Sequence, residues 1–252
     1  MAEQPFSPTR GSLKPVQKLS PEVARKIAAG EVIDRPNAIL RELLDNAVDS
    51  GADSIIAEIE GGGIDSIRVV DNGVGMTKDD LFTCAQPHAT SKITSEIDLE
   101  KLSTMGFRGE ALASIGAVCR LGITSARENE GAWHLETYLE TKRIITPAVL
   151  AKGTIVHAKG LFENFPPRRQ FLKRPAAETN LCKQTFVEKA IPFPYISFRF
   201  VVDNKIRFDF PKNQSLIQRV VQALELPESE QLFYEVSISD SQSKIPDWNI
   251  TV

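Results

Sequence analysis

Cysteine is scarce in this sequence, and Cys84, Cys119 and Cys182 stand far apart along its 252 residues. This spacing excludes a disulfide framework and a paired-cysteine zinc motif, and it favours a reducing, cytoplasmic location. No apolar run approaches the roughly 20 residues that a membrane helix needs. Residues 1–20 also lack the apolar stretch of a signal peptide. We therefore expect a protein that has no membrane partner.

An excess of one charge is also lacking. The chain has 30 basic and 33 acidic residues and a formal net charge of -3, so no global basic field predicts nucleic-acid binding. The motif Gly-x4-Gly-Lys-Ser/Thr does not occur, which excludes the ordinary P-loop route to nucleotide binding. The composition, 42% apolar and 25% charged, is typical of a globular protein with one or two domains.

The polar face of a predicted helix over residues 36–50 carries the first candidate residues. Glu42 and Asn46 are four residues apart, so both project from one face, with Asp49 on it and Asp45 beside it. A carboxylate at this place can act as a general base, and an amide oxygen can ligate magnesium. Helical spacing alone leaves the alternative open, because an acidic helix face is usually just solvated. The opposite, apolar face comprises Ile39, Leu40, Leu43, Leu44, Ala47 and Val48.

A second candidate site follows a predicted hairpin. Residues 54–60 and 64–70 are strand-like and are joined by three glycines, and the second strand leads directly into Asp71. Gly73 and Gly75 then permit a turn that brings the backbone close to a ligand. A carboxylate at a strand end suits the amino group of adenine. The alternative is a plain Asp-Asn-Gly turn.

A third candidate is the glycine loop Gly106-Phe107-Arg108-Gly109, which leads into a predicted helix over residues 110–115. Unpaired backbone N–H groups and the helix dipole at such a place favour a phosphate, although a simple helix cap is the alternative. Upstream, the polar segment 88–92 offers hydroxyls and a cation that could fold over a nucleotide as a lid. His134 and His157 have no ligand spacing, and we expect them to be packing or surface residues.

The rest of the chain predicts further helices and strands. The helices expected are at residues 22–27, 175–190 and 214–225. Strands that follow one another as a meander are expected at residues 120–125, 133–140, 142–149 and 154–159. A hairpin joins residues 198–202 to 205–210 across Asp203-Asn204, and residues 248–252 alternate like a strand.

Together, Glu42-x3-Asn46, Asp71-x-Gly73-x-Gly75 and the glycine loop before a helix resemble the gyrase, Hsp90, histidine-kinase and MutL (GHKL) group of ATPases. Residues 28–36, 88–92 and 106–112 resemble, in particular, the N-terminal ATPase region of bacterial MutL DNA mismatch-repair proteins. The resemblance covers nearly all of residues 19–252.

The resemblance implies an α+β fold: a two-layer α/β sandwich with a mixed sheet and helices on one face, followed by the start of a second, S5-like α/β domain. It implies an ATP-binding domain at 19–212 and the truncated second domain at 213–252. Residues 1–18 contain three prolines and little periodicity, so we expect them to form a mobile leader. The cofactors would be ATP and Mg²⁺.

The same resemblance implies a role for each candidate residue. Glu42 would activate the attacking water, Asn46 would hold Mg²⁺, and Asp71 would accept from the adenine amino group. The remaining nucleotide-binding residues would be Gly75, which gives the base room, the lid residues Thr90, Ser91 and Lys92, the phosphate-lining residues Gly106, Phe107, Arg108 and Gly109, and Thr154 beside Asp71.

The function implied is ATP-driven lid closure and homodimerisation that couple a MutS-like mismatch-recognition protein to repair, with DNA bound mostly by regions beyond this chain. Because a lysine from the second domain would also be needed, we expect weak hydrolysis. The alternative is a nucleotide-gated clamp in which turnover is incidental. A histidine kinase is disfavoured because no histidine precedes His88. The sequence departs from the family pattern at Pro87 and, in part, at Phe165-Pro166-Pro167-Arg168, and neither departure removes a candidate residue of the nucleotide site.

Overall fold

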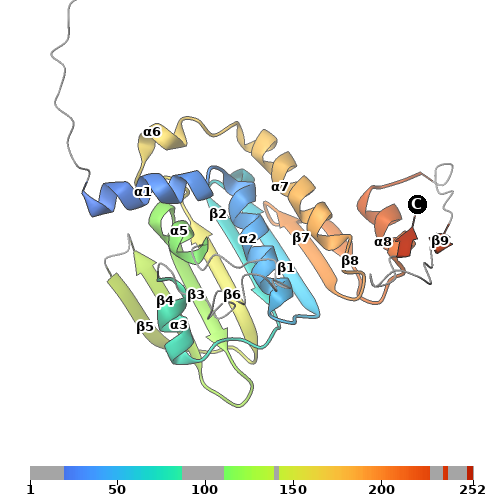
Figure 1. The fold of residues 1–252 in the computed structure, drawn as a ribbon, viewed down its shortest axis with the longest axis horizontal. Helices are drawn as coiled ribbons and strands as arrows, with labels where there is room; N and C mark the ends of the chain where they lie inside the picture. Colours follow the sequence, from blue (N-terminus) through green and yellow to red (C-terminus); the bar gives the residue numbers. More distant parts are fainter. Residues whose placement is uncertain (1–19, 87–110, 139–141, 228–234, 238–248, 252) are drawn as a thin grey trace, which may run out of the picture.

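A computed structural model of the chain describes residues 20–86, 111–138, 142–227, 235–237 and 249–251 (Figure 1). The helices of these residues are α1 (Pro21–Val32), α2 (Pro36–Asp49), α3 (Lys78–Cys84), α5 (Ala111–Val118), α6 (Pro166–Arg169), α7 (Pro175–Ala190) and α8 (Leu216–Ala223), with a 3-10 turn, η1, at Gly61–Gly63. The strands are β1 (Ser54–Glu60), β2 (Ser66–Asp71), β3 (Arg120–Ala126), β4 (Ala132–Tyr138), β5 (Lys142–Ala148), β6 (Gly153–Lys159), β7 (Ser197–Val202), β8 (Lys205–Phe210), β9 (Glu235–Ser237) and β10 (Asn249–Thr251).

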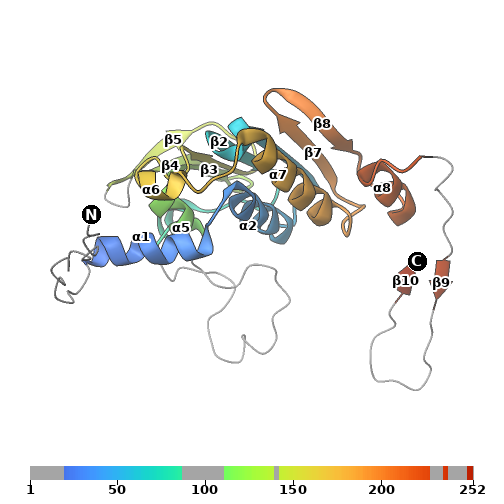
Figure 2. The same cartoon turned by 90° about the horizontal axis from the view of Figure 1, so that it is seen from above.

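Eight strands form one mixed sheet in the order β5-β4-β3-β6-β2-β1-β7-β8, and β9 and β10 form a separate antiparallel pair. Within the large sheet β1 and β7 run parallel, and the other neighbouring strands are antiparallel. Helices α1, α2, α5 and α7 lie together on one face of this sheet (Figure 2). The expected two-layer architecture, a mixed sheet with helices on one face, is confirmed.

The expected meander is only partly correct. β3, β4 and β5 do follow one another across the sheet, but β6 returns to pair with β3 and β2 instead of β5. Local strand patterns cannot show this return, because they carry no information on which strand a later segment pairs with. The consequence for the site is direct, since β6 brings Thr154 opposite Asp71.

The hydrophobic core lies between the sheet and the helices. The apolar face predicted for α2 is buried at Ile39, Leu40, Leu43, Leu44 and Ala47. A group of aromatic rings fills the space between α7 and the β7–β8 hairpin, where Phe186 stacks on Phe200 with ring centroids 4.7 Å apart. Burying a phenylalanine stabilises a fold by about 2–3 kcal/mol, so this group fixes the far edge of the sheet against α7.

Sequence patterns missed α3 and α6. α3 begins after Thr77, whose side-chain hydroxyl accepts from the backbone N–H of Asp80 at 3.1 Å, and this N-cap signal is readable in the sequence. α6 is a short helix with Pro166 in its first turn. Its Arg168 guanidinium donates to the carbonyl of Gly30 on α1. The Phe-Pro-Pro-Arg segment therefore forms a turn of helix that holds α1 in place.

Candidate functional site

Asp71, the last residue of β2, buries its carboxylate at the end of the strand. The residue is 7% exposed, and its Oδ1 accepts from the Gly73 backbone N–H at 2.9 Å and from the Ser50 hydroxyl at 3.3 Å. Burial raises the pKa of Asp71 from 3.8 to about 6, although the Gly73 N–H, the Ser50 hydroxyl and the Thr154 backbone N–H lower it. At neutral pH the carboxyl is therefore mostly ionised and fixed, which suits recognition of a single N–H donor.

Thr154 lies directly opposite Asp71 in the β2–β6 ladder, as expected. Its hydroxyl oxygen is 2.9 Å from that of Ser125, which is fully buried and also donates to the carbonyl of Gly153 at 3.1 Å. The backbone N–H of Met76 donates to the same Ser125 oxygen at 2.8 Å. Ser125 thus ties β3 to β6 and to the turn that follows Asp71.

The glycines of this turn are required by close approach of the backbone. Gly75 has a φ of 68°, and a Cβ there would collide with the carbonyl of Ala126. A Cβ at Gly153, whose φ is 103°, would collide with the carbonyl of Asp71. Gly75 is therefore demanded by the fold itself, in addition to any room it leaves for a bound base.

Ser50 connects Asp71 to α2. It is the C-cap residue of that helix, and its N–H donates to the carbonyl of Asn46 at 3.0 Å. Its hydroxyl lies 2.7 Å from the carbonyl of Ala47 and 3.3 Å from Asp71 Oδ1, and its carbonyl accepts from the N–H of Val74 at 3.0 Å. The C-terminal end of α2 is thereby fastened to the turn after β2.

Glu42 and Asn46 are half-buried along the same helix. At a rise of 1.5 Å per residue, Asn46 stands about 6 Å and Glu42 about 12 Å from Ser50 along the helix axis. The buried acceptor Asp71 of β2 therefore lies at the C-terminal end of α2, and the amide of Asn46 and the carboxylate of Glu42 follow toward the start of the helix. This order suits an elongated ligand with a base at one end and phosphates at the other.

Asp45 does not belong to this polar face. Its side chain is 9% exposed and forms an ion pair with Lys189 of α7, with Oδ1 and Nζ 2.5 Å apart. The helical wheel placed Asp45 beside Glu42 and Asn46, because sequence spacing does not reveal that a second helix covers this side of α2.

The predicted lid and phosphate-loop residues lie outside the described residues: Thr90, Ser91, Lys92, Gly106, Phe107, Arg108 and Gly109. The helix expected after the glycine loop is confirmed as α5, which begins at Ala111 and packs against α1. Asn164, which precedes α6, donates to the carbonyl of Ala117 in α5 at 3.0 Å.

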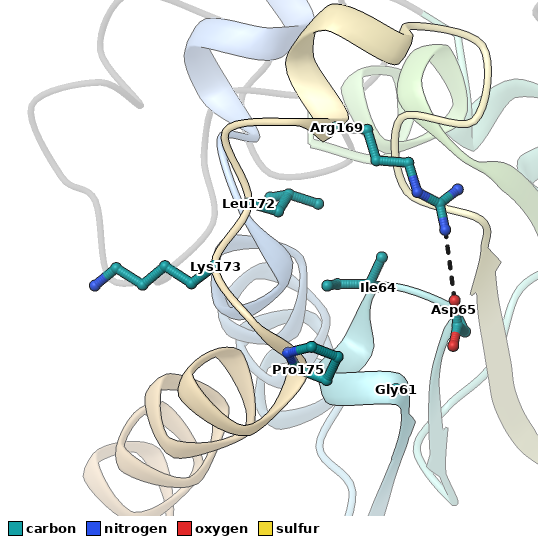
Figure 3. Close-up of a pocket in the computed structure, with 7 residues that line it drawn as sticks. All are labelled: Gly61, Ile64, Asp65, Arg169, Leu172, Lys173 and Pro175. Atoms are coloured by element: carbon teal, nitrogen blue, oxygen red, sulfur yellow. Dashed lines mark ion pairs between the residues drawn. The ribbon is translucent and has the colours of Figure 1, made fainter.

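A cavity of about 240 Å³ lies elsewhere, between η1 and the start of α7 (Figure 3). Asp65 and Arg169 on its wall form an ion pair at 3.5 Å. Asp65 stands before β2 and Asp71 ends it, so the cavity is at the opposite end of this strand from the Asp71 carboxylate. It is therefore separate from the Asp71 and α2 site.

The histidines offer no metal site in the part of the chain that the structure describes. His134 Nδ1 is 2.8 Å from the Thr124 hydroxyl, and His157 Nε2 is 2.9 Å from the Ser66 hydroxyl. Burial lowers the pKa of His157. Among described residues no group of three or more His, Cys, Asp or Glu is arranged for a metal ion, and no helix is long and apolar enough to cross a membrane.

The sequence of the chain is similar to those of known ATPases and DNA mismatch repair proteins. The family of histidine kinase-, DNA gyrase B- and HSP90-like ATPases matches residues 34–147, a range that includes Glu42, Asn46 and Asp71. The DNA mismatch repair protein MutL of Treponema pallidum is 43% identical over 242 residues, which cover 91% of this chain and 39% of that protein. MutL of Thermotoga maritima is 38% identical over 237 residues, 91% of this chain and 45% of that protein. The chain thus spans less than half the length of these curated relatives.

Solved structures give the same result. The Aquifex aeolicus MutL ATPase domain complexed with ADP has a TM-score of 0.65 and 25% sequence identity, over 82% of this chain and 73% of that one. The N-terminal domain of a DNA repair protein has a TM-score of 0.73 and 26% identity, over 88% of this chain and 66% of that one. Sequence and fold therefore lead to the same family.

Proposed function

This chain belongs to the MutL family of DNA mismatch-repair proteins, within the GHKL ATPases, and from that premise we propose that it binds ATP with Mg²⁺ and hydrolyses it. The observation that carries the proposal is the linkage of Asp71 through Ser50 to α2. It places the buried acceptor Asp71 of β2 at the C-terminal end of the helix that carries the amide of Asn46 and the carboxylate of Glu42.

The adenine end of the nucleotide lies at Asp71. Its buried carboxylate accepts a hydrogen bond from the adenine amino group, and Thr154 stands beside it across the ladder. A base that presents no amino group at this place does not form this hydrogen bond with the carboxylate, so the site favours adenine over such a base. Gly75, which has no side chain, gives the base room in this proposal.

The phosphate end lies along α2. An amide oxygen is a hard donor of the kind that Mg²⁺ accepts together with phosphate oxygens, and Asn46 supplies one about a turn along α2 from Ser50. When bound, Mg²⁺ neutralises charge on the phosphates. Glu42, one turn further, accepts a proton from the attacking water as general base.

Residues that the structure does not describe complete the site in this proposal. Thr90, Ser91 and Lys92 close over the nucleotide, and Gly106, Phe107, Arg108 and Gly109 line the phosphates at the start of α5. The start of a second domain at residues 213–252 would link this chemistry to dimerisation, to a MutS-like partner and to DNA in the cytoplasm. Hydrolysis by this chain alone is expected to be weak, because a lysine from that second domain would be needed.

Replacement of Glu42 by alanine tests the hydrolytic part of the proposal. General-base catalysis contributes about 10²–10⁴-fold, so Glu42→Ala should reduce phosphate release at least about 100-fold. Affinity for ATP, measured by calorimetry, should change less than about threefold, because no binding contact is assigned to this carboxylate. Glu58→Ala, which removes an exposed carboxylate paired with Arg68, is the matched control.

The outcomes separate the two candidate functions. Failure of the unaltered chain to bind ATP at millimolar concentration would refute the proposal as a whole. Partner loading that persists in Glu42→Ala with hydrolysis abolished would instead favour the nucleotide-gated clamp.

A further inference from the structure

Asp45 and Lys189 form a largely buried contact between α2, which carries Glu42 and Asn46, and α7. The Asp45 side chain is 9% exposed, that of Lys189 is 22% exposed, and Oδ1 and Nζ are 2.5 Å apart. Helices α2 and α7 are in contact and lie side by side on the same face of the sheet in both views (Figures 1 and 2). In the described residues the other Lys and Arg ion pairs are more exposed on both partners.

The position of Asp45 within α2 makes this contact relevant to the site. Asp45 directly precedes Asn46 and follows Glu42 by three residues. Successive side chains on a helix are about 100° apart, so a charge pair that holds Asp45 toward α7 also sets the direction in which Asn46 and Glu42 project.

Apolar contacts alone do not fix this rotation as closely. The buried leucines of α2 press the helix onto the sheet, but hydrophobic contact is non-directional, whereas the ion pair between Asp45 and Lys189 joins one position on α2 to one position on α7. A second polar contact also holds α2 against α7, near the start of α2, where the Asn37 amide donates to the Thr185 hydroxyl at 3.2 Å. Lys189 follows Thr185 by one turn on α7.

The contacts of the adenine end do not include α7, although Ser50 joins this end to the C-terminal end of α2. Asp71 belongs to β2, and its contacts with Gly73, Ser50 and Thr154 do not involve α7. Release of the contact between Asp45 and Lys189 should therefore disturb the phosphate end and spare the adenine end.

We propose that Lys189 is a positioning residue for the nucleotide site: through its ion pair with Asp45 it holds α2 in the rotation that directs Asn46 toward the metal and Glu42 toward the water. This role rests on the proposed function, because it assigns a metal ligand to Asn46. It adds α7, a helix with no residue in the site, to the elements that determine metal-dependent binding.

The test compares ADP binding with and without magnesium chloride by calorimetry. The variant is Asp45→Asn/Lys189→Met, which removes both charges together, because either single replacement leaves a buried charge unpaired and endangers folding. Lys183→Met, on the same helix and in an exposed pair with Glu225, is the matched control.

We expect magnesium to tighten ADP binding by the unaltered chain. In the double variant that magnesium effect should fall at least fivefold, while the dissociation constant for ADP without magnesium stays within twofold. The Lys183→Met control should keep the full magnesium effect. Thermal unfolding of the double variant provides a separate record of its stability.

A double variant with the full magnesium effect overturns the positioning role, whatever its stability, and leaves ATP binding intact as the proposed function. A double variant that loses ADP binding without magnesium to the same extent also overturns it, because the adenine end would then depend on the pair. If the unaltered chain binds ADP with no magnesium effect, the assignment of Asn46 falls and this proposal falls with it. If that chain binds no nucleotide at all, it is the proposed function that fails.

Discussion

Replacement of Asp71 by asparagine should make the protein more stable and a poorer binder of adenine nucleotides. Burial raises the pKa of Asp71 from 3.8 to about 6, which is about 2 pKa units or about 3 kcal/mol against the charged form. The asparagine side chain carries no charge and keeps an oxygen that can accept from Gly73 and Ser50. The variant loses about 1 kcal/mol because the new NH₂ group cannot accept from the Thr154 N–H. The expected net gain in the free energy of unfolding at pH 7 is therefore about 2 kcal/mol.

The raised pKa of Asp71 determines how stability changes with pH. Below pH about 4 the carboxyl is protonated in both the folded and the unfolded chain, so its charge costs no stability. Between pH about 4 and 6 the unfolded chain releases this proton first, and the contribution of Asp71 to stability falls by about 3 kcal/mol. Above pH about 6 it stays constant. Urea unfolding of both proteins from pH 3.5 to 8 should show a stability difference that grows with pH over this window and then levels off.

Affinity for ATP should rise with pH, whereas the contribution of Asp71 to stability falls. With a pKa of about 6, only about one tenth of Asp71 is ionised at pH 5, so ATP affinity should be about tenfold weaker there than at pH 8. Asp71→Asn should bind ATP weakly at every pH and lose this dependence. A variant that is less stable than the unaltered protein at pH 7, or a stability difference that does not change between pH 4 and 6, would refute the reasoning.

Two further predictions concern the stability of the fold. Gly75→Ala should lower the free energy of unfolding by more than about 2 kcal/mol, because it adds a clash with the Ala126 carbonyl to the cost of a positive φ. Gly51 has a φ of 72° and open space where a Cβ would be, so Gly51→Ala should lower the free energy of unfolding by only about 1–2 kcal/mol in the same urea titration. Equal losses of stability in the two variants would show that the predicted clash at Gly75 has no effect. Arg219 is fully buried and donates to five backbone carbonyls and Gln214, so Arg219→Met should cost about 4 kcal/mol or more. Arg199→Met, which breaks an exposed ion pair with Asp209, should lower the free energy of unfolding by less than about 1 kcal/mol, as measured by thermal unfolding. A similar loss of stability in both arginine variants would show that burial of Arg219 does not matter.

Local patterns in the sequence predicted most helices and strands. The apolar spacing of α2, the strand-like residues of β1 and the Asp203-Asn204 turn are signals carried by neighbouring residues, and the structure has each of these elements. The candidate residues Glu42, Asn46 and Asp71 were found because their spacing within a helix and their place after a strand are also local. Their assignment to a nucleotide site came from the resemblance to a family, since neither motif alone excludes a solvated helix face or a simple turn.

Ser50 and Ser125 were not predicted, although both hold the site together. Ser50 contacts Asp71 across 21 residues of chain, and Ser125 meets Thr154 across 29. A serine at a helix end or within a strand has no distinguishing pattern, because its partner is chosen by which elements the fold brings side by side. The position of β6 has the same origin, since pairing between distant strands depends on the whole sheet.

What this sequence determines by itself is therefore the kind of chemistry: an amide and a carboxylate four residues apart on a helix, and a carboxylate at the end of a strand. The tertiary structure decides the chemical state and the orientation of these groups. Burial raises the pKa of Asp71, Ser50 fastens it to α2, and Lys189 of α7 covers Asp45. Dielectric environment and contact between distant segments arise only when the chain is folded, and spacing along the chain carries neither.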